Sequence, residues 1–133
     1  MSFRDPASAE AAFYAAFGAL DVDMMRGVWM DSPEVSCIHP GGGLLQGTAE
    51  VLRSWTEVFR DSQPPRIAHR LLQSSSDQKL VVHTVEEMVN SGSGQRDVTI
   101  LATNIYVHVD DGWRMLAHHA SLPLVERRQP PLH

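Results

Sequence analysis

The chain of 133 residues and 14.8 kDa has the size of one domain, and 43% hydrophobic with 20% charged residues is typical of a globular protein. A net charge of −5 argues against nucleic acid as a partner, since phosphate binding needs a basic surface. The sequence has no signal-like N-terminus, no cysteine besides Cys37 and no apolar run of roughly 18 residues. We therefore expect one cytoplasmic domain over residues 1–133 that is not bound to a membrane.

The first half of the sequence predicts three helices. Asp5 before Pro6 is typical of an N-cap, and the three–four spacing of apolar residues continues this helix to Leu20. Asp21 starts a shorter second helix, and Thr48 is predicted to cap the third. The predicted buried face of the second helix consists of Met24, Met25, Val28 and Trp29. That of the third helix consists of Val51, Leu52, Trp55, Val58 and Phe59.

The second half predicts an antiparallel meander. A short strand at 35–39 lies between the second and third helices, and four longer strands follow at 67–75, 80–90, 97–109 and 113–121. Glycines at 91–94 and 110–112 indicate hairpin turns. The predicted fold is therefore α+β, with three helices on one face of a curved sheet, and residues 124–133 form an extended tail.

Alternation along the last strand predicts two apolar faces. It places Trp113, Met115, Ala117, His119 and Ser121 on one face and the residues between them on the other. Large apolar residues on both faces indicate that neither is fully exposed to water. We therefore expect a homodimer through the outer face of the sheet.

The seven histidines do not predict a metal site, and we expect no cofactor. His118 and His119 are adjacent in a strand, so their side chains point to opposite faces and cannot share one ion without distortion. His39 ends the first strand before Pro40, which favours an extended conformation. This places it either at the wall of a pocket or in a surface loop.

Three polar residues interrupt apolar strands. One of Glu86 and Glu87 must point inward, where it would be either a functional carboxylate or a structural one held by Arg70 or Arg96. Asn104 places an amide in the middle of a strand beside Tyr106. Both positions are candidates for a polar site within the fold.

Three segments resemble the NTF2-like superfamily, in its SnoaL-like branch, which includes ketosteroid isomerase. They are FYAAFGALDVDMMRGVWMD, CIHPGGGLLQGTAEVLRSWTEVF and LATNIYVHVDDGWRMLAHHASLP. The last also looks like the association domain of calcium/calmodulin-dependent kinase II. The resemblance implies a cone-shaped sheet, an apolar pocket between sheet and helices, and a homodimer.

The comparison with ketosteroid isomerase implies site residues. The place of its general-base aspartate is held by His39, and that of its protonated oxyanion-hole aspartate by Asn104. Its first-helix tyrosine falls at Ala15, with Tyr14 adjacent but pointing elsewhere. A neutral histidine can accept a proton and an amide can donate to an enolate oxygen, so the site keeps a capacity for acid/base chemistry.

The sequence thus predicts a SnoaL-like domain that binds a small apolar or cyclic molecule. The alternatives are an isomerase or lyase, with His39 as base and Asn104 as oxyanion donor, and a non-catalytic association module. His118 is expected at the same catalytic site. The predicted ligand-binding residues are Phe17, Trp29, Trp55, Glu86 and Tyr106.

Overall fold

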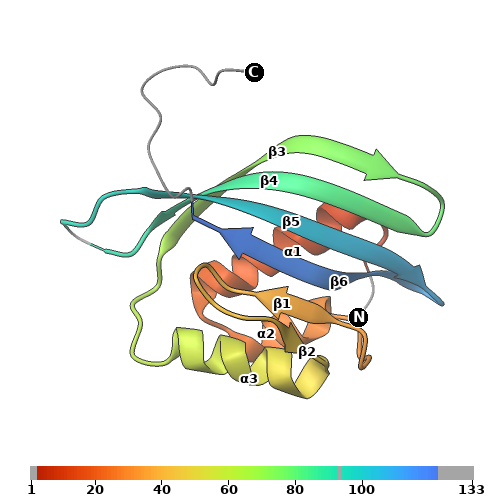
Figure 1. Ribbon diagram of the computed structural model, residues 1–133, viewed down its shortest axis with the longest axis horizontal. Helices are drawn as coiled ribbons and strands as arrows, with labels where there is room; N and C mark the ends of the chain where they lie inside the picture. Colours follow the sequence, from red (N-terminus) through yellow and green to blue (C-terminus); the bar gives the residue numbers. More distant parts are fainter. Residues whose placement is uncertain (1–2, 93, 123–133) are drawn as a thin grey trace.

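The computed structural model describes residues 3–92 and 94–122, and the predicted tail at 124–133 lies outside them. Six strands form one sheet in the order β2-β1-β6-β5-β4-β3 (Figure 1). The helices are α1 (Pro6–Ala19), α2 (Val22–Val28) and α3 (Thr48–Phe59). The strands are β1 (Ser36–Ile38), β2 (Leu45–Gln46), β3 (Arg66–Ser76), β4 (Leu80–Asn90), β5 (Val98–Val109) and β6 (Gly112–Ser121).

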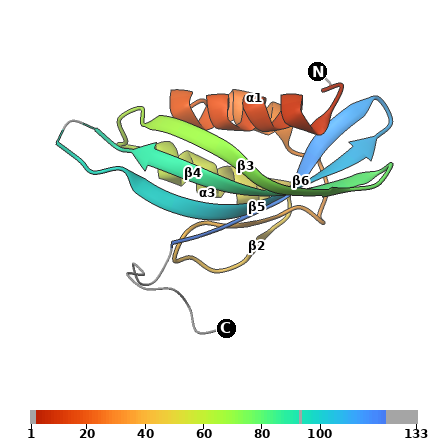
Figure 2. The same ribbon diagram turned by 90° about the horizontal axis from the view of Figure 1, so that it is seen from above.

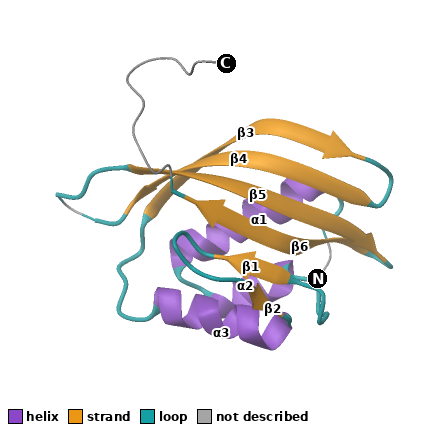
Figure 3. Ribbon diagram, in the orientation of Figure 1, coloured by secondary structure: helices purple, strands orange, loops and turns teal. Residues whose placement is uncertain are grey.

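The four long strands form the predicted antiparallel meander, and this curved sheet with three helices confirms the α+β fold. β1 pairs parallel with β6, which places a segment from early in the chain beside the last strand. Seen from above, α1 runs along one face of the long strands (Figure 2). α3 lies by the short strands β1 and β2 (Figure 3), and α2 packs against α1 and α3. None of the helices in the described residues is long and apolar enough to span a membrane.

Two of the three predicted helix caps are confirmed. The Asp5 carboxylate accepts a hydrogen bond from the backbone N–H of Ser8, and Asp21 accepts one from that of Met24. The third prediction is wrong, because α3 is capped by Gly47, whose φ of 86° suits glycine. The Thr48 hydroxyl instead accepts from the Ser32 N–H at 2.8 Å, and so holds the loop that follows α2.

A β-bulge in β6 overturns the predicted alternation of its faces. Tyr106 pairs with Met115, but the preceding residue, Ile105, pairs with Ala117, so β6 carries one extra residue. Met115 is therefore fully buried on the helix side, as is His118 beyond the bulge. Trp113 also packs against the core, whereas His119 lies on the outer face. The outer face of β6 therefore does not carry Trp113 or Met115.

The hydrophobic core fills the space between the helices and the sheet. Its large members come from every layer and include Phe13, Met25, Trp55, Tyr106 and Met115, each at most 1% exposed. Met24, predicted to be buried, is 44% exposed on α2. The inward residues of β4 and β5 complete this core, and several of them are polar.

Candidate functional site

Seven polar side chains form one hydrogen-bonded network inside the core. Each is at most 6% exposed. α1 contributes two of them one turn apart, and the alternation of β4, β5 and β6 points the others toward that helix. They are Glu10, Tyr14, His83, Glu87, Asn104, Tyr106 and His118.

Asn104 is the centre of this buried polar network. Its amide Nδ2 donates to Glu10 Oε2 at 3.2 Å and to the Tyr14 hydroxyl at 3.0 Å. Its Oδ1 lies 2.6 Å from His118 Nδ1, and an amide oxygen only accepts, so this ring nitrogen carries the proton. Complete burial, with smaller contributions from His39 and His119, lowers the pKa of His118 to about 3. His118 is therefore neutral near pH 7.

The network contains two carboxyl groups, each bound by a tyrosine. The Tyr106 hydroxyl donates to Glu10 Oε2 at 2.6 Å, and His83 Nδ1 lies 3.1 Å from both Glu10 oxygens. The Tyr14 hydroxyl donates to Glu87 Oε2 at 2.6 Å. Burial, opposed by the Tyr14 hydrogen bond and assisted by the nearby Glu10, raises the pKa of Glu87 to about 7. Burial also raises the pKa of both tyrosines, which keeps their hydroxyls protonated as donors.

His39 lies outside the network, at the end of β1. Its Nε2 is 2.9 Å from Ser54 Oγ, and that hydroxyl lies 2.6 Å from the Val51 carbonyl, to which it donates. The hydroxyl oxygen therefore accepts from His39 Nε2–H, which assigns the free lone pair of the imidazole to Nδ1. Burial lowers the pKa of His39, so the ring is neutral near pH 7.

Trp55 connects His39 with the network. Its ring lies 4.7 Å from the His39 ring and 5.9 Å from the His118 ring, measured between centroids. The three predicted catalytic residues, His39, Asn104 and His118, are thus on the same side of the sheet. Trp55 is packed by further aromatic rings, those of Phe13, Phe17 and Phe59.

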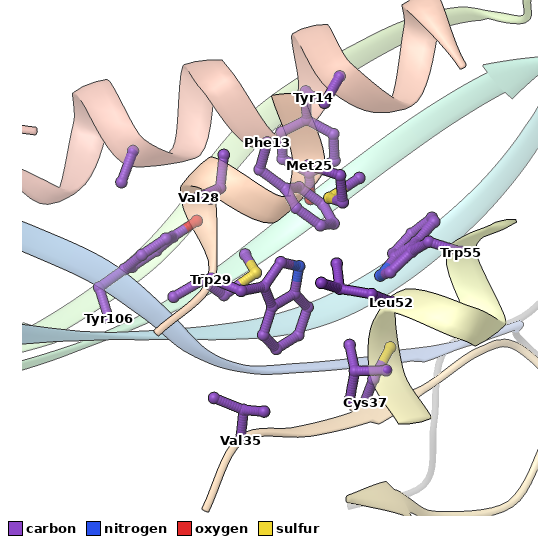
Figure 4. Close-up of a cluster of buried hydrophobic side chains, with 14 of the residues drawn as sticks. Phe13, Tyr14, Met25, Val28, Trp29, Val35, Cys37, Leu52, Trp55 and Tyr106 are labelled. Atoms are coloured by element: carbon purple, nitrogen blue, oxygen red, sulfur yellow. The ribbon is translucent and has the colours of Figure 1, made fainter. Parts of the chain in front are cut away.

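The predicted ligand-binding residues separate into three locations. Trp29, Trp55 and Tyr106 are buried in the core (Figure 4), and Phe17 is only partly buried. Glu86 was predicted at this site, but it lies on the opposite face of the sheet, 3.0 Å from exposed Arg70. Glu87 is the glutamate that points inward. It lies two residues after buried Val85 in β4, and alternate residues of a strand share a face.

Tyr14 corrects the expectation from the ketosteroid isomerase comparison. That comparison matched the first-helix tyrosine to Ala15. Successive helix residues point about 100° apart, so Tyr14 was expected to point away from the site. In the structure Tyr14 faces the sheet and bonds Asn104, and its ring stacks on His69 at 4.3 Å. The sequence reasoning also missed Glu10 and His83. The signal for Glu10 was its i, i+4 spacing from Tyr14 on α1.

A cavity of about 350 Å³ opens beside the ends of α1 and α3. This is within the size range of small-molecule sites. Its lining residues do not include the three predicted catalytic residues. The apolar members of the lining are Phe17, Leu20, Val58, Pro65 and Val89, and the polar ones are Ser62, Gln63 and Ser91.

No group of three or more histidine, cysteine, aspartate or glutamate side chains in the described residues is arranged to hold a metal ion. The network instead satisfies its own polar groups. Two buried groups remain without an acceptor in the described part of the chain, the indole Nε1–H of Trp29 and that of Trp55. Burying an unpaired donor costs about 1–3 kcal/mol.

Comparison with known proteins shows the family of this chain and several similar structures. The SnoaL-like domain family matches residues 7–125. A Thiobacillus denitrificans protein named for the calcium/calmodulin-dependent protein kinase type II association domain is 37% identical, with a TM-score of 0.89 over 92% of this chain and 98% of that one. A Streptomyces avermitilis protein described as an NTF2-like dehydratase is 28% identical, with a TM-score of 0.80 over 88% of this chain and 92% of that one.

The chain is also similar to the F-box protein SKIP8 of Arabidopsis thaliana. It is 28% identical over 131 residues, which make up 95% of this chain and 53% of that protein. The chain therefore spans about half the length of this relative.

Proposed function

The chain belongs to the SnoaL-like domain family, and from that premise we propose that it binds a small, largely apolar organic molecule in the cavity beside α1 and α3. The observation that carries the proposal is the lining of this 350 Å³ space. Five of the eight lining residues are apolar, and the three polar ones can orient a ligand. Small-molecule binding is compatible with this fold. The cavity supports the proposal, because its size and apolar lining suit such a ligand.

Binding fits the geometry better than catalysis with Asn104 as the oxyanion donor. The Asn104 amide already donates to Glu10 and Tyr14, so stabilising an enolate oxygen would require breaking one of these bonds. His39 could accept a proton on Nδ1. The Asn104 amide, however, has no free N–H to stabilise the enolate that this proton transfer would form. Binding in the cavity requires no such rearrangement.

Ethylbenzene, a small apolar probe, is expected to raise the midpoint of thermal unfolding. A ligand at 100 times its dissociation constant adds about 2.7 kcal/mol of stability, which is roughly 4–10 °C for a domain of this size. Val58→Trp fills the cavity from α3 and should abolish the rise. Differential scanning calorimetry with and without ethylbenzene measures both effects.

Met24→Trp is the matched control for this experiment. Met24 and Val58 are both exposed on helices, at 44% and 37%, but Met24 does not line the cavity. Its variant should keep the full rise. The proposal is contradicted if ethylbenzene leaves the wild-type midpoint unchanged, or if both variants respond like wild type.

We also propose that the chain forms a homodimer through the outer face of its sheet. This face carries partly buried Val82 and Ile105, exposed Leu101 and the small Ala117. An apolar sheet face of this kind is stabilised by covering it with a second copy. The relative named for an association domain supports this assignment.

Ile105→Glu is expected to convert the dimer to a monomer, since the new carboxylate would be buried unpaired at the interface. Sedimentation equilibrium at micromolar concentration should give twice the 14.8 kDa chain mass for wild type and the single mass for the variant. Leu71→Glu, at an exposed position on the other face, should remain dimeric. A monomeric wild type would refute the proposal. Met115→Glu is unsuitable for this test, because Met115 is in the core.

A further inference from the structure

The cavity beside α1 and α3 lies at the C-terminal ends of both helices. Phe17 belongs to the last turn of α1 and Leu20 follows that helix directly, whereas Val58 belongs to the last turn of α3. Both helices end on the side of the molecule where the turn between β4 and β5 lies (Figure 1). The peptide dipoles of a helix place about half a negative elementary charge at its C-terminus. The cavity therefore lies in the negative field of two helices.

Basic side chains do not balance this field. α1 and α3 carry no lysine, arginine or histidine in their last turns, where such residues are favoured, whereas α2 carries Arg26 there. Arg60 follows α3, but its guanidinium lies 3.1 Å from the Glu57 carboxylate, so this pair has no net charge. None of the described residues that line the cavity is charged. A positive charge on a bound molecule would therefore be stabilised by both helix ends.

The polar lining residues offer oxygen atoms and remain in contact with solvent. Ser62, Gln63 and Ser91 are exposed, whereas Val89 in the same lining is buried. The Ser62 hydroxyl donates to the Val58 carbonyl at 2.7 Å, so its oxygen is left as an acceptor. The side chains of Gln63 and Ser91 also carry oxygens that can accept. An ammonium group has three donors and no acceptor, and near solvent it avoids the cost of burying an unpaired charge.

Resting on the function proposed above, we propose that the ligand of this cavity is an organic amine, bound as its ammonium ion with the apolar part against Phe17, Leu20 and Val89. The Phe17 ring adds a further preference, because the face of an aromatic ring attracts a cation. A carboxylate fits less well, since both helix ends would repel it and no described lining residue is basic.

Phenethylamine, phenethyl alcohol and phenylacetate test this inference, because they share a ring and a two-carbon chain and differ in the charge at its end. In isothermal titration calorimetry at pH 7, the amine should bind roughly three- to thirtyfold more tightly than the alcohol, as expected for two helix ends. Phenylacetate should bind more weakly than the alcohol. High salt should reduce the preference for the amine. Val58→Trp, which fills the cavity, should remove the binding of all three compounds.

Ala19→Lys gives an independent readout of the helix ends. It places a basic side chain in the last turn of α1, at an exposed position that does not line the cavity. The preference for the amine over the alcohol should fall roughly two- to fivefold, while the affinity for the alcohol changes little. Ala7→Lys is the matched control, since it adds the same charge at an exposed position about 18 Å away along the same helix. This variant should keep the preference of the wild type.

The outcomes separate this inference from the proposed function. Equal binding of the amine and the alcohol, tighter binding of phenylacetate, or amine binding that survives Val58→Trp overturns the inference. An equal loss of preference in Ala7→Lys and Ala19→Lys also overturns it, because the amine would then respond only to the net charge of the protein. In each case the proposed function stands if ethylbenzene still raises the unfolding midpoint. If neither ethylbenzene nor any of the three compounds binds, both proposals fail. Should Ala19→Lys not fold, the three compounds on the wild-type protein still decide.

Discussion

Asn104→Ala is expected to destabilise the domain by about 3–5 kcal/mol, which is a large part of the stability of a typical domain. The substitution removes the acceptor of His118 Nδ1–H and the donor to both Glu10 and Tyr14. All of these groups are too deeply buried to bond water instead. Urea unfolding followed by circular dichroism measures the loss directly.

Gln73→Ala is the control for Asn104→Ala. It removes the same amide group from an exposed position in β3, and surface substitutions of this kind usually change stability by less than about 0.5 kcal/mol. A loss below about 1 kcal/mol for Asn104→Ala would contradict the expectation that Glu10, Tyr14 and His118 depend on this amide for their hydrogen bonds. It would indicate that water enters the core and replaces the amide.

Glu87→Gln is expected to stabilise the protein above neutral pH. Burial raises the pKa of this carboxyl from its usual 4.5 to about 7. A raised pKa means that the folded state holds its proton more tightly than the unfolded chain, so stability falls as the pH rises from about 4.5 to 7. The full penalty, on the order of 3 kcal/mol, applies at higher pH.

The glutamine variant has no proton to lose, and its amide oxygen can still accept from the Tyr14 hydroxyl. The gain in unfolding free energy over wild type should therefore be small at pH 5 and approach about 3 kcal/mol at pH 8. Glu86→Gln, one residue away on the other face beside exposed Arg70, should show no such gain. A difference between Glu87→Gln and wild type that does not vary with pH would refute this account.

The sequence predicted the elements of the fold because each has a local signal. Apolar residues at three–four spacing, the caps at Asp5 and Asp21, and glycine-rich turns are all properties of short segments. The bulge in β6 has no such signal. A bulge does not require particular residue types in the strand. It nevertheless reverses the face of the sheet on which every residue beyond it lies. Regular alternation therefore placed Met115 and His119 on one face, whereas the structure places them on opposite faces.

The buried polar network was only partly predictable for the same reason. Asn104 interrupts an apolar strand and was identified by that interruption. The choice between Glu86 and Glu87 depends on the register with β3 and β5, which is a property of the whole sheet. Glu10 resembles an ordinary exposed acid on a helix, and only its partners His83, Asn104 and Tyr106 justify its burial.

The network also sets an order of events during synthesis. Glu10 and Tyr14 leave the ribosome early, but their partners Asn104 and Tyr106 follow 90 to 96 residues later. Contacts so distant along the chain form slowly, because a long loop must close before they contribute. His83 and Glu87 on β4 become available to Glu10 and Tyr14 first. The first helix therefore gains its full set of hydrogen bonds only when the fifth strand emerges. The domain acquires its specific core only once nearly the whole chain has been translated.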